Sequence, residues 1–241
     1  MTMRLKLPSH LQEVDYMKSF PAVSSLLLAC ALFASGQEQT PDHRLRSAAD
    51  VFREVMATPD KGIPHGLLDR AQCIVIVPGM KKAAFVFGAD YGKGYAVCRD
   101  TTGSFGAPDP VALSGGSFGI QLGVDSTDVI LLIMNDKGLN HLLADKFSIG
   151  SDAAAAIGPV GRDAAADTDA SLRAEILSWS RTHGLFAGAS LDGTVIAHDK
   201  GETRKLYGRE YRGRELIRGH VPPPPASADL LTELNAYGPR K

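Results

Sequence analysis

Leu113-Ser-Gly-Gly-Ser-Phe-Gly-Ile-Gln-Leu-Gly-Val-Asp-Ser-Thr-Asp-Val-Ile-Leu-Leu-Ile-Met-Asn135 is the stretch that decides the fold of this 241-residue chain. It begins with closely spaced glycines and ends in an almost continuous apolar run. The wider segment from Pro78 to Asp163 holds 14 of the 25 glycines, set between short apolar runs. Glycine at this density permits tight turns and close backbone approach. We therefore predict an α+β fold in one domain, with a glycine-rich, mostly antiparallel β-sheet or barrel-like sandwich and flanking helices.

Two hairpins are predicted around this stretch. The first pairs Ala83–Phe87 with Gly94–Cys98 through a turn at Asp90–Lys93, and the second lies within Gly184–Ala197 and turns at Leu191–Gly193. Alternating or continuous apolar runs predict further strands at Val111–Leu113, Phe118–Val124 and Asp128–Met134. Ala174–Arg181 fits a strand or a helical turn, and we favour a strand.

Helices are predicted towards both ends of the domain. Apolar residues at three- and four-residue spacing indicate an amphipathic helix at Asp42–Ala57 and another helix at Asp136–Lys146, with a helical turn at Ile63–Ala71. The stretch 198–221 is basic and helical in its spacing. After a polyproline spacer at Pro222–Pro225, residues 227–237 predict a last helix that docks back on the domain.

Residues 1–36 are predicted to be an export signal. Lys18 precedes an apolar run at Phe20–Phe33, and the small residues Ala34-Ser35-Gly36 offer a cleavage site. The segment before this run contains two acidic residues, so translation could begin at Met17. The run is shorter than the roughly 20 residues that a membrane-spanning helix needs.

A lipid anchor is the alternative to cleavage after Gly36. Leu27-Leu-Ala-Cys30 has the outline of a lipoprotein signal that ends in a modifiable cysteine, although the residues after Cys30 are still apolar. Both processing routes export the chain, to the periplasm or outside the cell. In such an oxidising compartment Cys73 and Cys98 could form a disulfide, and two buried reduced thiols are the alternative.

Charge gives no support for a nucleic-acid partner. Residues 37–241 hold 23 basic and 25 acidic side chains, a net charge of about −2. Cations are nevertheless concentrated in two places. Lys81 and Lys82 lie at the entry of the first predicted hairpin, with Lys93 at its turn and Arg99 at its exit. Lys200–Arg218 holds seven Lys or Arg against three Glu. An ordinary solvated surface is the alternative interpretation of both clusters.

One motif favours an enzyme. Gly115-Gly-Ser-Phe-Gly119 matches the G-x-S-x-G nucleophile motif, and Asp128 or Asp145 and then His183 or His198 follow in hydrolase order. That motif needs a helix after the serine, whereas the residues after Gly119 predict another strand. A serine hydrolase using Ser117 is therefore the alternative, and we predict a protein that is not an enzyme. The scattered histidines and acidic residues predict no metal site, and no motif indicates a cofactor.

Eight sequence blocks, in order, resemble the SYLF domain family across Asp42–Tyr237. They are Ile63-Pro-x-x-Leu-Leu-x-x-Ala71, Ile76-Val-Pro-x-x-Lys-Lys82, Gly92-Lys-Gly94, Cys98-Arg99, Leu113-x-Gly-Gly-Ser-Phe-Gly-x-Gln-x-Gly123, Asp128-Val-x-Leu-Leu-x-Met-Asn135, Gly158-Pro-Val-Gly-Arg162 and Gly184-Leu-Phe-Ala-Gly188. The resemblance implies a non-catalytic lipid-binding domain. Eukaryotic relatives bind phosphoinositides, and fungal ones also bind and bundle actin filaments.

Carried onto this chain, the resemblance assigns lipid binding to the cations inside matching blocks, which are Lys81, Lys82, Lys93, Arg99 and Arg162. The expected partner of an exported chain is an anionic phospholipid membrane surface, and actin is not expected. A third alternative, besides lipid binding and hydrolysis, is a structural envelope protein that binds other proteins.

Overall fold

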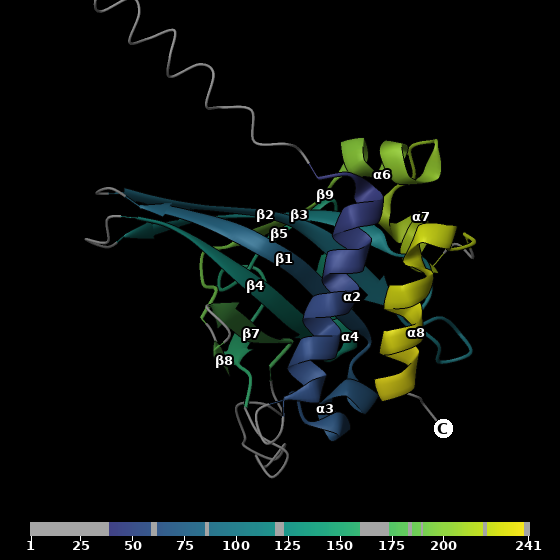
Figure 1. Ribbon diagram of the computed structural model, residues 1–241, viewed down its shortest axis with the longest axis horizontal. Coiled ribbons are helices and arrows are strands. Elements are labelled where there is room, and N and C mark those ends of the chain that lie inside the picture. Colours follow the sequence, from purple (N-terminus) through teal and green to yellow (C-terminus); the bar gives the residue numbers. More distant parts are fainter. Residues whose placement is uncertain are drawn as a thin grey trace, which may run out of the picture. The chain divides into compact units, whose positions relative to one another are not determined.

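The computed structural model describes residues 39–58, 62–84, 87–118, 123–159, 174–182, 185–188, 190–218 and 221–238. From Thr40 onward the chain forms one compact unit, in which helices pack against a single sheet (Figure 1). This arrangement confirms the predicted α+β class. The predicted export signal and Cys30 lie outside the described residues, as does Arg162.

The sheet contains nine strands among the described residues, in the order β5-β9-β3-β2-β1-β4-β7-β6, with β8 paired to β7. They are β1 (Cys73–Ala84), β2 (Phe87–Cys98), β3 (Asp109–Phe118), β4 (Gly123–Ile133), β5 (Lys146–Ser148), β6 (Ala155–Ile157), β7 (Ile176–Thr182), β8 (Leu185–Gly188) and β9 (Val195–His198). Only the β6–β7 pair is parallel. The prediction of a mostly antiparallel sheet is therefore confirmed, as is the strand chosen for Ala174–Arg181.

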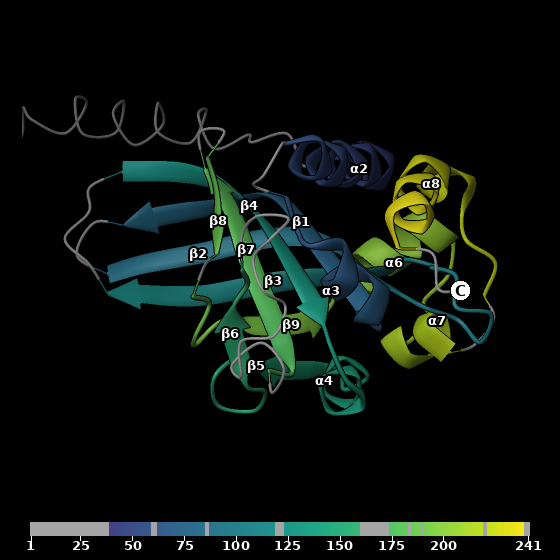
Figure 2. The same cartoon turned by 90° about the horizontal axis from the view of Figure 1, so that it is seen from below.

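The helices cluster around one end of the long strands (Figure 2). They are α2 (Pro41–Ala57), α3 (His65–Arg70), α4 (Asp136–Leu142), α6 (Lys200–Tyr207), α7 (Gly213–Arg218) and α8 (Ala228–Tyr237), with a 3-10 turn η1 at Pro225–Ser227. Thr40 begins α2 because its side-chain oxygen accepts a hydrogen bond from the His43 amide. Both the amphipathic helix at Asp42–Ala57 and the C-terminal helix are confirmed, and α8 packs against α2.

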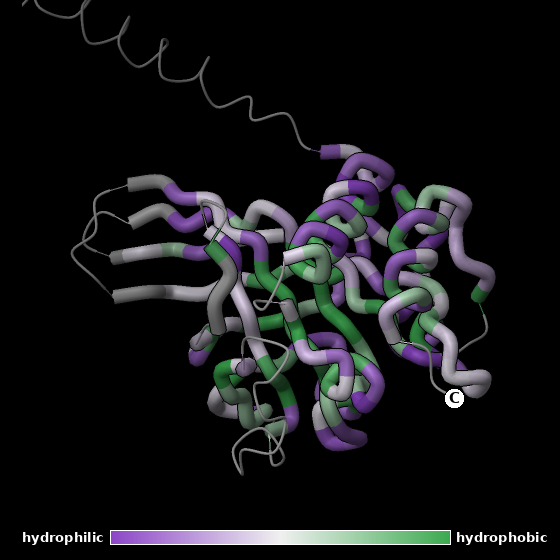
Figure 3. The backbone as a smooth tube through the Cα atoms, turned by 60° about the horizontal axis from the view of Figure 1, so that its bottom comes forward, coloured by the Kyte–Doolittle hydropathy of each residue, from purple (hydrophilic) through white to green (hydrophobic). Residues whose placement is uncertain are grey.

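Strand alternation divides the core into two layers, one on each face of the sheet. Ile74 and Ile76 of β1 face α2 and pack with Phe52 of that helix. Val75 and Val77 face the opposite side and pack with Phe147, Ile196 and Ile217. Hydrophobic residues are concentrated where the sheet lies against the helices (Figure 3). Covering both faces explains why the central strands are apolar almost throughout.

The first hairpin prediction was wrong in its register. Cys73–Ile76 pair with Tyr95–Cys98, and Lys81–Ala84 pair with Gly88–Tyr91, so the predicted turn at Asp90–Lys93 lies inside β2. Gly92 and Gly94 allow β2 to pack closely against β1, and they do not form a turn. A Cβ added at Gly94 would collide with the Ile76 backbone, and one at Gly92 would lie 2.6 Å from Val77 Cγ1. The matching irregularity in β1 falls between Ile76 and Lys81, where Gly79 has a φ of 61°.

Other predicted elements differ in their partners or limits. β8 and β9 do not form a hairpin with each other, because β8 pairs with β7 whereas β9 lies between β3 and β5. Gly193 still turns the chain before β9, with a φ of 81°. Helix α4 ends at Leu142, and Lys146 already belongs to β5. The basic stretch is two short helices, because the left-handed Gly208 ends α6.

Cys73 and Cys98 lie directly opposite each other at the ends of β1 and β2 and are joined by a disulfide. Their sequence separation is 25 residues. In the chain-entropy model, closing a loop of that length stabilises a fold by about 3 kcal/mol. The bridge therefore fixes the register of the two central strands at the end nearest the helices.

A glycine exchange tests the close approach of β1 and β2. We expect Gly94→Ala to lower the free energy of unfolding by about 3 kcal/mol or more, because the added methyl group meets backbone that cannot move aside. Gly116→Ala is the matched control, since its nearest neighbour, the Gly88 carbonyl oxygen, would lie 3.8 Å away. Urea unfolding measures both variants. Equal stabilities would show that Gly94 is not under this constraint.

Candidate functional site

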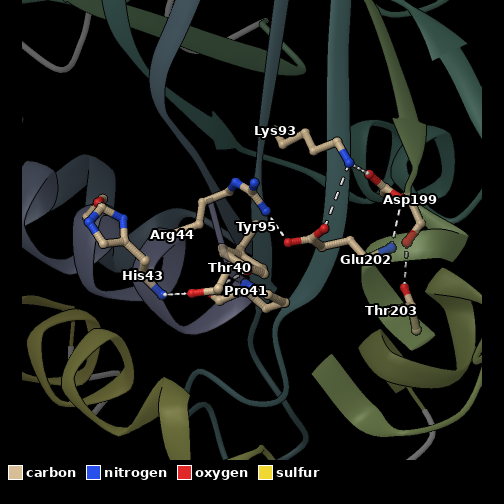
Figure 4. A network of polar contacts seen from close by, with 10 residues as sticks. Thr40, Pro41, His43, Arg44, Lys93, Tyr95, Asp199, Glu202 and Thr203 are labelled. Carbon is tan, nitrogen blue, oxygen red and sulfur yellow. Dashed lines mark hydrogen bonds and ion pairs between the residues drawn. The ribbon is translucent and has the colours of Figure 1, made fainter. Parts of the chain in front are cut away.

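Lys93 lies in a buried network of charges and not on an open surface (Figure 4). Its ammonium group is 3.1 Å from Asp199 Oδ2 and 3.8 Å from Glu202 Oε2. Glu202 in turn forms an ion pair with Arg44 of α2, and both of these side chains are buried. Burial alone would lower the pKa of Lys93, but the hydrogen bond and charge of Asp199 outweigh it and raise that pKa. Lys93 therefore stays charged, and its ammonium group is engaged by carboxylates of the same domain.

The same network joins three elements that are far apart in the sequence. Asp199 begins α6 by accepting a hydrogen bond from the Glu202 amide. Tyr95 of β2 donates a hydrogen bond from its hydroxyl to the Pro41 carbonyl at the start of α2. Removing one partner of a buried ion pair typically costs about 3–5 kcal/mol. The network therefore fixes α2 and α6 against β2.

Arg99 is likewise a structural residue. It donates hydrogen bonds to the carbonyl oxygens of Ala71, Gly103 and Leu68 at 2.9, 2.6 and 3.0 Å. Its guanidinium group also lies 4.2 Å from the centre of the Phe105 ring. These contacts hold the turn after β2 against the end of α3.

Lys81 and Lys82 remain on the long strands, and Lys82 has an acidic residue opposite it on each neighbouring strand. Lys81 is exposed, with its ammonium group 3.2 Å from Ser126 Oγ. Lys82 lies in register between Asp90 of β2 and Asp125 of β4. In the sequence, Asp90 is the one acidic residue close to these lysines. The pairing of β1 with β4 brings a second one, Asp125, next to Lys82. The four described cations of the predicted lipid site thus do not form one basic patch.

A larger concentration of exposed cations lies on α6, α7 and the segment between them. We call it the basic surface, and it consists of Lys200, Arg204, Lys205, Arg209, Arg212, Arg214 and Arg218, all of them exposed. Of the three glutamates in this run, Glu202 is buried in the network described above. Glu210 and Glu215 are exposed. The exposed side chains of this segment therefore carry an excess of five positive charges.

Two tyrosines anchor the basic surface to the sheet. Tyr207 donates a hydrogen bond to the Pro108 carbonyl at 2.7 Å, and its ring packs edge-on against Tyr211. The Arg209 guanidinium lies 4.5 Å from the centre of the Tyr211 ring. Beside α7 is a recess of about 150 Å³ lined by Leu143, Ala144, Asp145, Arg212 and Arg214. Two guanidinium groups at one recess suit an anionic group such as a phosphate, which the Asp145 carboxylate would oppose.

His198 forms a buried pair with Asp109 under α7. Its Nδ1 is 2.7 Å from Asp109 Oδ1, and its Nε2 is 2.9 Å from the Tyr211 carbonyl oxygen. When Asp109 is ionised, both partners accept hydrogen bonds, so both ring nitrogens carry a proton and the ring is cationic. Burial raises the pKa of Asp109, and the pair is therefore charged only above that raised value. Burial alone would lower the pKa of His198, but the hydrogen bond and charge of Asp109 outweigh it and raise that pKa. The pair fixes the segment that carries the basic surface.

This pair predicts a pH dependence of stability. Because the pKa of His198 is raised in the fold, its stabilising effect is complete below its ordinary value of about 6.5 and is lost as pH rises through the raised value. We expect the free energy of unfolding to fall over that range. His198→Gln should remove this slope and cost about 3 kcal/mol at a pH where both His198 and Asp109 are charged, because it leaves the Asp109 carboxylate buried without its partner. His65→Gln, which replaces an exposed histidine, is the control. An unchanged slope in His198→Gln would contradict the assignment of the pH dependence to His198.

The structure does not assemble a hydrolase triad from Ser117 and His198. Ser117 lies near the end of β3, whereas His198 pairs with Val111, six residues earlier on that strand. At about 3.3 Å per residue these two positions are about 20 Å apart. Asp128 is bound to Arg181 and accepts a hydrogen bond from the Gly79 amide. His183 lies outside the described residues.

Within the described residues, no group of histidine, cysteine and acidic side chains is arranged to hold a metal ion. The helices described above are also too short or too polar to cross a membrane. What the fold presents is a charged surface on an α+β domain, typical of a binding protein.

Comparison with known proteins supports this class. Residues 114–237 match the model of the Ysc84 family, described as Las17-binding protein actin regulator. The chain is 27% identical over 198 residues to SH3 domain-containing YSC84-like protein 1 of Rattus norvegicus, covering 80% of this chain and 58% of the relative. It is 35% identical over 178 residues to an SH3 domain-containing protein of Schizosaccharomyces pombe, covering 72% and 41%. LAS seventeen-binding protein 3 of Saccharomyces cerevisiae is 30% identical over 180 residues, covering 73% and 39%.

The chain therefore belongs to the Ysc84 family, that is, to the SYLF domain proteins whose blocks its sequence resembles. It spans little more than half the length of the rat relative and about two fifths of the fungal ones. The Saccharomyces cerevisiae relative is named for binding, the family description names binding and actin regulation, and none of these names denotes an enzyme.

Proposed function

We propose that this chain is an exported, non-catalytic domain that binds anionic phospholipid membranes peripherally through the basic surface of α6 and α7. The observation that carries the proposal is the outward position of all seven cations while Glu202 is buried. Near an anionic bilayer each such cation contributes on the order of 1 kcal/mol. Several together suffice for a reversible attachment that salt weakens.

The recess beside α7 refines the proposal. Arg212 and Arg214 both line it, so it is the part of the basic surface where two guanidinium groups could meet one phosphate group. A lipid head group held there would be bound by direct hydrogen bonds in addition to the diffuse attraction. The predicted cations Lys93 and Arg99 have structural roles, and they take no part in the proposed contact.

The proteins that the family's names mention, Las17 and actin, define the rival role. Those names state protein binding for the relatives, and a chain with the same domain could bind other proteins as a structural component of the envelope. Export would separate this chain from actin, which is why we propose lipid as its partner. Of the two roles, only lipid binding predicts that the domain attaches to vesicles that contain no protein.

Vesicle flotation tests the proposed contact. We expect the domain to bind phosphatidylglycerol-containing vesicles at low salt and to bind phosphatidylcholine vesicles less. Arg212→Gln with Arg214→Gln should weaken binding to the anionic vesicles roughly thirtyfold, since two cations contribute about 2 kcal/mol. Arg46→Gln with Arg70→Gln removes two exposed cations from α2 and α3 and is the matched control.

Three outcomes would count against the proposal. Absence of binding to anionic vesicles would favour the protein-binding role. Equal binding to both lipids at all salt concentrations would exclude electrostatic attachment. Equal losses in the two double variants would mean that net charge, and not the basic surface, controls binding.

Export is tested by the mass of the mature N-terminus in cells. We expect a chain that begins at Gln37 after cleavage, and a chain that begins at a lipid-modified Cys30 would support the lipoprotein alternative. Either product supports export. A chain that keeps Met1 or Met17 and stays inside the cell would contradict the proposed location.

A further inference from the structure

A single row of charged residues crosses the four long strands. Lys82 of β1 pairs with Asp90 of β2 on one side and with Asp125 of β4 on the other. Asp90 pairs in turn with Gly115 of β3. The four positions therefore lie at one level of the sheet, and we call this level the charged row. The level before it contains Lys81 and the exposed Tyr91, with Ser114 and Ser126 beside them.

Beyond the charged row, none of the four strands carries a charged residue. The next level is Val124, Ala83, Ala89 and Gly116, and the level after that is Gly123, Ala84, Gly88 and Ser117. Of these, Ala89 and Gly116 are exposed. The described strand ends, residues 83–84, 87–89, 116–118 and 123–124, hold no Asp, Glu, Lys or Arg, and they include Phe87 and Phe118.

These strand ends project away from the rest of the domain. In Figures 1 and 2 they extend beyond α2, α6, α7 and α8, which gather at the opposite end of the sheet. The basic surface lies near the start of β3, because Gly213 of α7 packs on Asp109. The strand ends are at the other end of β3, nine residues away and thus about 30 Å distant.

We infer that the charge-free ends of β1–β4 form a second membrane contact, which inserts into the interface of a lipid bilayer independently of the basic surface. In proteins that enter a membrane interface, exposed aromatic and lysine side chains lie at the level of the head groups, next to the uncharged segment that inserts. Tyr91 (51% exposed) and Lys81 have the corresponding positions next to the charge-free strand ends. This contact goes beyond the proposed electrostatic attachment because it needs no anionic lipid.

The pairing of the strands limits the depth of insertion. Among the described strands, β9 pairs with β3 only at Val111–Ser114, and β7 pairs with β4 only from Thr127 onward. Near the charge-free ends, the outer edges of β3 and β4 thus have no partner among the described strands, and the hydrocarbon core does not tolerate unpaired backbone groups. Two levels of four residues lie beyond the charged row, and Phe87 and Phe118 pair at one further level of β2 and β3. At about 3.3 Å per level the depth is about 10 Å, which is that of an interfacial contact.

Neutral vesicles at high salt separate this contact from the basic surface, because electrostatic attachment is then absent. We expect residual binding of the whole mature domain to phosphatidylcholine vesicles under these conditions. A tryptophan introduced as Ala89→Trp should shift its emission to shorter wavelength and be quenched by brominated lipid. The native Trp179 is fully buried, so its emission is a constant background.

A charge placed on either side of the charged row gives the decisive comparison. Gly116→Asp adds a charge one level beyond the row and should weaken binding to neutral vesicles about fivefold, since a charged side chain costs up to about 1 kcal/mol near the interface. Ser114→Asp lies two residues earlier on the same strand, is also exposed, and should change binding less than twofold. Gly116→Ala keeps the position uncharged and controls for the backbone change.

The outcomes distinguish the two membrane contacts. Absence of tryptophan quenching, or equal effects of Gly116→Asp and Ser114→Asp, would overturn insertion while leaving the basic surface untouched. Loss of anionic-vesicle binding in the Arg212 and Arg214 variant with quenching intact would support both. If light scattering shows that Gly116→Asp separates a dimer in the absence of lipid, the strand ends contact a second copy, and insertion is overturned.

Discussion

The close approach of β1 and β2 is the constraint on which the rest of the structure depends. A side chain at position 94 would overlap the Ile76 backbone, so this close approach requires glycine. The disulfide of Cys73 and Cys98 fixes the same two strands at their ends. β1 pairs with β4 on its other side, so its register determines that of the sheet. The position of Lys93 and the composition of the charged row both follow from it.

Buried charges then determine how the helices sit on this sheet. Arg44, Lys93, Asp199 and Glu202 come from three elements and neutralise one another beneath α6. His198 and Asp109 do the same beneath α7. The Glu202 carboxylate is buried and paired with Arg44, so it does not offset the exposed cations of α6 and α7. Its burial therefore increases the net positive charge of the basic surface. The stability of the fold and its proposed contact with lipid therefore depend on the same residues.

Sequence patterns predicted the elements better than their partners. Apolar spacing found α2 and α8, and it found the strand at 176–182, because these periods reflect local backbone geometry. The hairpin register was wrong because glycines at 92 and 94 fit a turn and a close contact equally well. Arg44 was missed, although it lies on the same face of α2 as Ala48 and Val55, which would have indicated an inward position.

The sequence by itself determined the α+β class, the family and the concentration of cations after residue 198, since each is a property of residue order. Only the tertiary structure decided which charges face solvent. Lys93 and Arg99 became structural, and Asp125 joined Lys82 from a strand more than forty residues away. Pairing between distant strands and burial of ion pairs are long-range effects, and no local pattern of residues contains them.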